Sequence, residues 1–323
     1  MRAVVVEQVG GPEVLKVAEL PDPEPQPGQV VVRVAAVGVN FMDIYQRQGV
    51  GGYRPKQFPF VLGSEGAGTI TAVGADVNGL SAGDRVAWAG VAGSYAEQVV
   101  LPADRAVPLP ADLDLNVAAA VMLQGMTAHY LCYSTYPVRE GDVTVVHAAA
   151  GGVGELLTQM VKQRGGVVVA TTSGGKKAEV ARDAGADHVV GYDVFRATVT
   201  GVTGGVGAHV VYDGVGQATF GESLASLRHR GMMVLYGASS GQVPPFDPQR
   251  LNSGGSLFLT RPTLVHYIAD RNELLWRARD LFDWLAKDQL QVRIGGTYPL
   301  ADAAKAQEDL AARRTTGKLL LLP

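Results

Sequence analysis

Cysteine is almost missing from this chain: Cys132 is the only one among 323 residues. One thiol cannot form a disulfide framework within the chain, and it cannot supply the several cysteines of a structural zinc site. We therefore expect no disulfides and no bound metal. So little cysteine fits a reducing compartment, which we take to be the cytoplasm.

Charge is also sparse, because charged residues make up 18% of the sequence and the formal net charge is −3. No stretch is rich in lysine and arginine, so nothing draws the chain toward nucleic acid or an anionic membrane. The apolar run at residues 3–6 is too short for a signal peptide. Residues 115–138 carry no charge but contain several polar side chains. We expect a buried helix pair there, or one long helix that links two domains, and not a membrane span.

The chain shows two successive patterns. Its first hundred residues form short, valine-rich runs separated by glycine and proline, which predicts a small β-barrel or sandwich. The expected strands are residues 2–8, 15–20, 30–39, 68–73, 85–89 and 94–101. From Gly141 onward, apolar runs alternate with amphipathic segments, which predicts a doubly wound Rossmann sheet. Its six strands are expected at residues 143–147, 167–171, 188–190, 209–212, 232–236 and 257–259.

The end of the chain carries no new motif. Two helices, with a short strand between them, are expected at residues 270–287 and 301–313, and an apolar strand follows at residues 318–322. Because an apolar final strand usually pairs with an existing sheet, we assign this tail to the first domain. The expected domains are residues 1–123 with 265–323, and residues 124–264.

The most informative motif joins the first Rossmann strand to its helix, at residues 147–154 (His-Ala-Ala-Ala-Gly-Gly-Val-Gly). Small residues let the backbone approach a pyrophosphate, and the helix N-terminus supplies free N–H donors. Ala149 stands where the usual fingerprint has its first glycine. After the second strand, where an NAD enzyme carries an acidic residue, this chain has no acid and carries two lysines, Lys176 and Lys177. That difference favours a 2′-phosphate and therefore NADPH.

Two further segments contain candidate site residues. Residues 38–45 end a β-run and hold Asn40, Asp43 and Tyr45, which either form part of a site or stabilise a turn. Glu65 belongs to the glycine-rich turn at residues 63–68 and is either catalytic or structural, of which we favour the structural role.

Together these segments resemble the zinc-independent branch of the medium-chain dehydrogenase/reductase superfamily, in particular the quinone oxidoreductases (zeta-crystallin-like NADPH:quinone reductases). The resemblance covers essentially the whole chain and is carried by residues 39–45, 63–68, 82–86, 124–128, 147–154 and 256–262. It implies an α/β protein with a GroES-like, β-rich catalytic domain and a six-stranded, doubly wound Rossmann domain that binds NADPH. It also implies a homodimer through the edge of the Rossmann sheet, here the strand at residues 257–259.

The resemblance further implies two overlapping sets of site residues. Around the nicotinamide and substrate it places Asn40, Asp43, Tyr45, Tyr53, Gln124 and Thr127. On the cofactor it places Asn40, Thr127, Ala150, Gly151, Gly152, Val153, Gly154, Ser173, Lys177, Tyr192, Ser239, Ser240, Phe258, Thr260 and Lys318. The amide of Asn40 and the hydroxyls of Thr127 and Tyr45 are then the expected hydrogen-bond donors to an acceptor oxygen.

The expected chemistry depends on two positions that are zinc ligands in related enzymes but not in this chain. Zinc alcohol dehydrogenases resemble this chain but have a cysteine ligand where Asn40 stands and a histidine where Ser64 stands. Hydride or electrons should therefore pass from NADPH without a metal, in a cleft between the domains, to an acceptor that takes hydride readily. A quinone is the first choice, and a conjugated enone or alkenal is the alternative. A third hypothesis, of a different class, is an NADPH-binding structural or RNA-binding relative.

Overall fold

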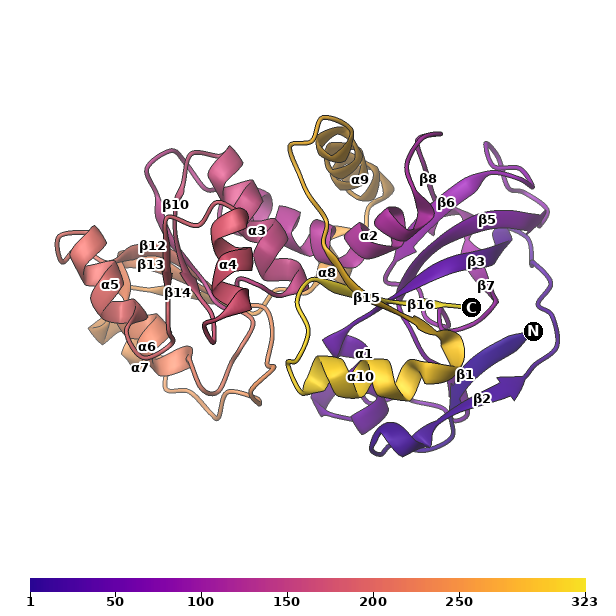
Figure 1. Ribbon diagram of the computed structural model, residues 1–323, viewed down its shortest axis with the longest axis horizontal. Coiled ribbons are helices and arrows are strands. Elements are labelled where there is room, and N and C mark those ends of the chain that lie inside the picture. The colour runs from indigo at the N-terminus through magenta and orange to yellow at the C-terminus, as the bar shows by residue number, and fades with distance from the viewer. The chain divides into compact units, whose positions relative to one another are not determined.

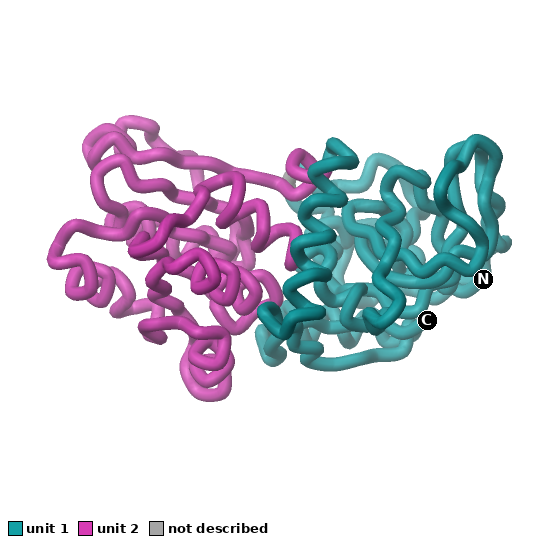
Figure 2. Tube along the Cα trace, turned by 90° about the horizontal axis from the view of Figure 1, so that it is seen from above, with its two compact units in different colours: residues 1–123, 269–323 teal, residues 124–268 magenta. Residues whose placement is uncertain are grey.

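The computed structural model describes residues 1–323 except Gly51, and Figure 1 labels its helices and strands. The chain forms two compact units, drawn in different colours in Figure 2. Unit 1 consists of residues 1–123 and 269–323, and unit 2 of residues 124–268. The chain thus returns to unit 1 after Ile268, whereas the sequence places this boundary after residue 264.

Unit 1 is built on two β-sheets of short, valine-rich strands. The larger has the order β15-β16-β3-β5-β6-β8, with β7 also paired to β3, and the smaller has the order β2-β1-β4. The strands are β1 Arg2–Val6, β2 Leu15–Glu19, β3 Gln29–Val39, β4 Phe60–Val61, β5 Glu65–Val73, β6 Arg85–Ala89, β7 Gln98–Pro102, β8 Val107–Pro108, β15 Ile294–Pro299 and β16 Lys318–Leu322. Their buried side chains share one core around Trp88, which confirms the predicted β-rich domain.

The last strand of the chain lies inside the larger sheet (Figure 1). β16 runs antiparallel to β3, with Leu319 opposite Val39 and Leu320 opposite Gly38. Leu319 and Leu321 of β16 enter the core and Leu320 is also buried, whereas Leu322 is exposed. This register brings Lys318, the first residue of β16, to the end of β3.

Three helices of unit 1 are stabilised by a cap at their first turn or by packing on a neighbouring helix. α1 (Phe41–Gln48) starts at the end of β3, where the N–H of Asn40 donates to the Asp43 carboxylate at 2.9 Å. α9 (Arg271–Ala286) is capped by the Asp270 carboxylate. α10 (Ala303–Ala311) packs against α1.

Unit 2 is a six-stranded parallel sheet with the order β11-β10-β9-β12-β13-β14. Its strands are β9 Val143–Val146, β10 Val167–Thr171, β11 His188–Val190, β12 Ala208–Asp213, β13 Leu227–Leu235 and β14 Phe258–Thr260. Its helices are α3 Gly152–Gln163, α4 Lys176–Asp183, α5 Phe195–Val202, α6 Phe220–Ala225, α7 Gln249–Ser253 and α8 Leu264–Tyr267. If these strands are numbered 1 to 6 along the chain, their order across the sheet is 3-2-1-4-5-6. This order confirms the predicted doubly wound sheet and puts the switch point between β9 and β12.

A single helix, α2 (Leu115–Tyr130), forms most of the long uncharged segment and continues as a π-helix at Leu131–Thr135. The Asp114 carboxylate caps its start by accepting from the N–H groups of Asn116 and Val117. Of the two forms that the sequence predicts, a buried helix pair or one long helix, the structure has the long helix. Within the described part of the chain, no helix is long and apolar enough to span a membrane.

Three strands start three or more residues from the expected position, and one of them is β5, which begins at Glu65 instead of residue 68. β13 begins at Leu227 instead of residue 232, because the polar residues 228–230 hide its start in the sequence. β7 begins at Gln98 instead of residue 94, because Ser94 and Tyr95 form a bend whose side chains hydrogen-bond inward, to Trp88 and Asp43.

Candidate functional site

The turn between β9 and α3 fits the glycine-rich motif. The residue with a left-handed backbone is Ala148 (φ 52°), not Ala149, which stands where the fingerprint has its first glycine. A side chain at Gly154 would meet the carbonyl oxygen of Ala148 at 2.4 Å, so only glycine fits there. The first N–H groups of α3 follow, and such groups are the donors that a pyrophosphate needs.

Gln124 lies against this turn. A Cβ added to Gly152 would come within 3.1 Å of the Gln124 Cδ and 3.3 Å of its Nε2. Gln124 is the first residue of unit 2 and is nearly buried, as is Thr127 farther along α2. The structure therefore brings the predicted residue Gln124 to the predicted phosphate-binding turn, although α2 and α3 are separate elements.

A pocket of about 620 Å³ opens where β10 and β11 end. Its wall contains Ser173 and Tyr192, which the sequence assigns to the adenosine end of NADPH. The charged residues of this wall are Arg182, from α4, and Asp193. Lys177 lies at the start of α4 and is half-buried. Two predicted residues thus share a pocket with a cation, Arg182, that the sequence interpretation missed.

A second turn lies beside the glycine-rich turn, because β12 is the neighbour of β9. Oδ1 of Asp213, the last residue of β12, accepts from the N–H groups of Val215 (2.8 Å) and Gly216 (2.9 Å). Ser240 fastens the loop after β13 to this turn, since its Oγ donates to the carbonyl of Val215 at 2.7 Å. The N–H of Ser239 donates to the same turn. The predicted pair Ser239 and Ser240 is therefore held next to the switch point.

His147 is buried and hydrogen-bonded on both sides of its ring. Nδ1 lies 2.9 Å from the Thr171 hydroxyl and Nε2 2.9 Å from the Ser223 hydroxyl, which in turn donates to Asp213. Burial lowers the pKa of His147, and the charge of Asp213 opposes that shift. Both ring nitrogens are thus engaged in joining β9 to β10 and α6.

The last two predicted cofactor residues lie on β14, at the end of the sheet order. Phe258 begins this strand with 55% of its surface exposed, and Thr260 ends it half-buried. The next residue, Arg261, donates at 3.0 Å to the carbonyl oxygen of Tyr236, which directly follows the neighbouring strand β13.

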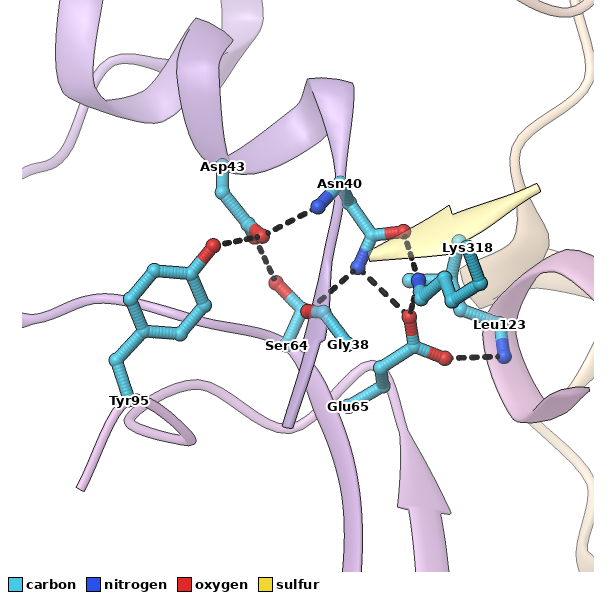
Figure 3. A network of polar contacts seen from close by, with 8 residues as sticks. All are labelled: Gly38, Asn40, Asp43, Ser64, Glu65, Tyr95, Leu123 and Lys318. Carbon is cyan, nitrogen blue, oxygen red and sulfur yellow. Dashed lines mark hydrogen bonds and ion pairs between the residues drawn. The ribbon is translucent and has the colours of Figure 1, made fainter. Parts of the chain in front are cut away.

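In unit 1, Asn40 belongs to a buried polar network at the end of β3 (Figure 3). Its Nδ2 donates to the Gly38 carbonyl at 3.2 Å and to Oε1 of Glu65 at 2.8 Å. Its Oδ1 accepts from Lys318 Nζ at 2.9 Å. Because both amide protons bond inside the protein, the donor role expected for the Asn40 amide is wrong in this structure.

Glu65 and Lys318 form a fully buried ion pair, with 0% and 2% of their side chains exposed. The other carboxylate oxygen, Oε2, accepts from the N–H of Leu123 in α2 at 2.7 Å. Burial lowers the pKa of Lys318, and Glu65 opposes the shift. Glu65 thus connects β16, β3 and α2. The cofactor contact expected of Lys318 stays a prediction.

Asp43 is the second buried carboxylate of the network (Figure 3). Besides the Asn40 N–H, it accepts from the hydroxyls of Ser64 (3.2 Å) and Tyr95 (2.9 Å). Burial raises the pKa of Asp43 to about 7, although the hydrogen bonds from Asn40 and Tyr95 and the charge of Lys318 oppose the shift. Burial, followed by the charge of Asp43, raises the pKa of Tyr95 well above its ordinary value.

This shift predicts a pH-dependent stability. The pKa of Asp43 is about 7 in the folded state and 3.8 as the ordinary value, so folding takes up a proton between these pH values. Stability from this group is complete below pH ~4 and falls as the pH rises through ~7, by up to about 4 kcal/mol. Asp43→Asn does not titrate, and its neighbours Ser64 and Tyr95 can either donate to or accept from the amide. Denaturant unfolding measures the free energy of unfolding of both proteins at pH 5 and pH 8. Relative to the wild type, the variant should be more stable at pH 8 than at pH 5. The same difference at both pH values would contradict this prediction.

The aromatic residues predicted for the substrate lie together on and after α1. The rings of Tyr45 and Tyr53 are 5.4 Å apart and tilted by 46°, and Phe41 lies 6.3 Å from Tyr45. The structure therefore groups Tyr45 and Tyr53 into one aromatic surface beside the Asn40 network, on the helix that Asn40 begins.

The two positions at which zinc alcohol dehydrogenases carry a metal ligand are occupied here by side chains that bond within the protein. Asn40 and Ser64 both hydrogen-bond within the network, to Glu65 and Asp43 respectively. Among the described residues, no group of three or more His, Cys, Asp or Glu side chains could hold a metal ion.

Comparison with known proteins identifies the family. Residues 26–111 match the alcohol dehydrogenase GroES-like domain, and residues 152–277 match the zinc-binding dehydrogenase family. The quinone oxidoreductase of Pseudomonas aeruginosa is 42% identical over 317 residues, which cover 97% of each chain. The chain belongs to the quinone oxidoreductase type of medium-chain dehydrogenase/reductase.

Two other members of this family resemble the chain over nearly its whole length. The 2-haloacrylate reductase of a Burkholderia species is 38% identical and covers 99% of this chain and 98% of its own. The structure of Escherichia coli quinone oxidoreductase complexed with NADPH is 38% identical, with a TM-score of 0.97 over all of both chains. The predicted fold and the sequence resemblance are thereby confirmed.

Proposed function

We propose that this protein is an NADPH-dependent quinone reductase that works without a metal. The observation that carries the proposal is the pocket after β10, whose wall offers the Ser173 hydroxyl, the Tyr192 ring and the Arg182 guanidinium. Phosphate groups prefer such cationic and hydroxyl donors, and an acid that would hold a ribose hydroxyl is not found directly after this strand. The similarity to quinone oxidoreductases, one of them complexed with NADPH, supports the acceptor and the cofactor.

The cofactor would extend along the carboxyl edge of the unit 2 sheet. The pyrophosphate binds the N–H groups of residues 150–154, and the 2′-phosphate binds Ser173, Lys177 and Arg182. Tyr192 packs on the adenosine end. The nicotinamide side is assigned to Ser239 and Ser240, with Phe258 and Thr260 beyond them.

NADPH, when bound, supplies a hydride, and with one proton from solvent a quinone becomes a hydroquinone. The side chains of the protein orient the acceptor. Tyr45 and Tyr53 present an aromatic surface to a flat ring. Because the Asn40 amide is used inside its network, the hydroxyls of Tyr45 and Thr127 are the candidate donors to the oxygen that gains charge.

One assay tests this function against its alternatives. The absorbance of NADPH is followed with a benzoquinone, a conjugated enone and 2-haloacrylate in parallel, with and without a chelator. We expect the quinone to be reduced fastest, at a rate that the chelator leaves unchanged. The similarity to a 2-haloacrylate reductase favours the conjugated double bond as the second candidate, so faster enone or haloacrylate reduction would replace the quinone assignment. NADPH binding without turnover of any acceptor would support the non-enzyme alternative.

The phosphate assignment predicts a change in cofactor preference. Lys177→Ala should raise the KM for NADPH roughly 10-fold or more, because a charged hydrogen bond to the 2′-phosphate is lost. The KM for NADH, which lacks that phosphate, should stay within about twofold. Arg182→Ala should shift the two KM values in the same way, whereas Lys176→Ala, on the exposed side of the same turn, should change neither by more than about threefold. Equal effects on both cofactors would remove these residues from the phosphate site.

Assembly and location are also part of the proposal. β14 ends the unit 2 sheet and exposes Phe258, so it could pair with the same strand of a second copy as a homodimer. The cytoplasm is the proposed compartment, on the single cysteine of the sequence.

A further inference from the structure

Lys318 contacts a predicted site residue from the far end of the chain. The register of β16 against β3 puts it at Asn40, and its ammonium donates to the Asn40 Oδ1 and to Glu65 (Figure 3). Only 2% of the Lys318 side chain is exposed. The hydrogen bonds of this enclosed ammonium therefore go to Asn40 and Glu65.

The two charges of this pair fix the orientation of the Asn40 amide. An ammonium group can only donate hydrogen bonds, so it requires the amide oxygen of Asn40 to face it. A carboxylate can only accept, so Glu65 requires the amide nitrogen. Removal of the ammonium would leave the Asn40 oxygen without its buried donor and the Glu65 carboxylate without its counter-charge.

Gly38 leaves space for the Glu65–Lys318 pair because it has no side chain. A Cβ added to Gly38 would lie 2.2 Å from Glu65 Oε1 and 2.5 Å from Lys318 Cε. Both atoms are at the far ends of flexible side chains, so an added methyl would displace the ion pair before it displaced the backbone. Gly38→Ala therefore disturbs the pair without removing either charge.

We propose that Lys318 is a positioning residue for the reaction: with Glu65 it holds the Asn40 amide in one orientation, and it acts through Asn40, which begins α1, on the position of Tyr45 in that helix, without touching NADPH. This inference rests on the proposed quinone reductase function. It differs from the direct cofactor contact that the resemblance implies for Lys318. The two roles make opposite predictions about NADPH affinity.

The test separates turnover from cofactor binding in Lys318→Met, which keeps the length of the side chain and removes its charge. We expect kcat with a benzoquinone to fall roughly 10- to 100-fold, as when a reacting group is misplaced. The Kd for NADPH, measured by fluorescence titration, should stay within about twofold. Lys318→Arg should restore part of kcat because it keeps a buried cation. Lys305→Met removes an exposed lysine of the same unit and should leave both quantities unchanged.

Two further variants cover the case in which Lys318→Met fails to fold. Lys318→Met/Glu65→Gln leaves no unpaired buried charge, and Gly38→Ala keeps both charges. Both should lower kcat with little change in the NADPH Kd. Loss of NADPH affinity in parallel with kcat, or full kcat in all three variants, would overturn the positioning role. Wild-type turnover is measured first: its absence overturns the proposed function, whereas normal kcat of the variants in an active background overturns only this inference.

Discussion

Glu65→Ala should lower the free energy of unfolding by about 3–5 kcal/mol, the largest stability loss that we expect from one exchange in unit 1. The variant leaves the Lys318 ammonium buried without its counter-charge. It also removes the acceptor of the Asn40 amide and of the Leu123 N–H. A buried group that loses its partner bears the full cost of having left water. Denaturant unfolding at neutral pH measures this loss directly.

A matched control separates this loss from the removal of any paired carboxylate. Glu7 pairs with Lys16 at 3.3 Å, and about two thirds of each side chain is exposed. Glu7→Ala should therefore change stability by less than about 1 kcal/mol. A similar small change in Glu65→Ala would show that the interior pair adds no more than a surface pair does.

The double variant Glu65→Ala/Lys318→Met tests whether the loss belongs to the unpaired charge. Removing both charges leaves no uncompensated ion, so the double variant should be more stable than Glu65→Ala alone. The recovery should be incomplete, because the Leu123 N–H and the Asn40 amide still lack their acceptor. If the double variant were less stable by the sum of the single losses, the two residues would not be coupled.

The fold of unit 2 could be predicted from the sequence because each of its signals is local. A buried parallel strand appears as an apolar run, and the glycine-rich turn shows where strand changes to helix. The doubly wound order then follows from six such runs. The strand starts that were most in error, at β13 of unit 2 and at β5 and β7 of unit 1, are those where polar side chains belong to the strand or to a buried bend.

The network of unit 1 could be predicted only in part, because its contacts join distant segments. Asn40 and Asp43 lie together in the sequence and were found together. Glu65 and Lys318 are 253 positions apart, and no spacing rule connects them. The sequence therefore assigned one to structure and the other to cofactor, although the structure joins them. Tyr95 was missed entirely, since an isolated tyrosine in a bend carries no pattern.

Gly154→Ala should weaken NADPH binding by about 100-fold or more and lower stability by about 1–3 kcal/mol. The added Cβ would lie 2.4 Å from the Ala148 carbonyl oxygen and 2.8 Å from the Ala149 Cα. Both are backbone atoms of the turn, and Ala148 already has a left-handed backbone, so the turn cannot yield without losing its shape. A displaced turn no longer directs the N–H groups of α3 at one point, where the pyrophosphate would bind.

Gly151→Ala is the matched exchange in the same turn, because its Cβ would meet only the Ala148 oxygen, at 3.2 Å. Its stability should stay within about 1 kcal/mol of the wild type. Thermal unfolding without cofactor, followed by fluorescence titration with NADPH, measures stability and affinity separately. Gly154→Ala should lower both, since packing and binding depend on the same turn. Wild-type affinity in a folded Gly154→Ala variant would mean that this turn does not hold the cofactor.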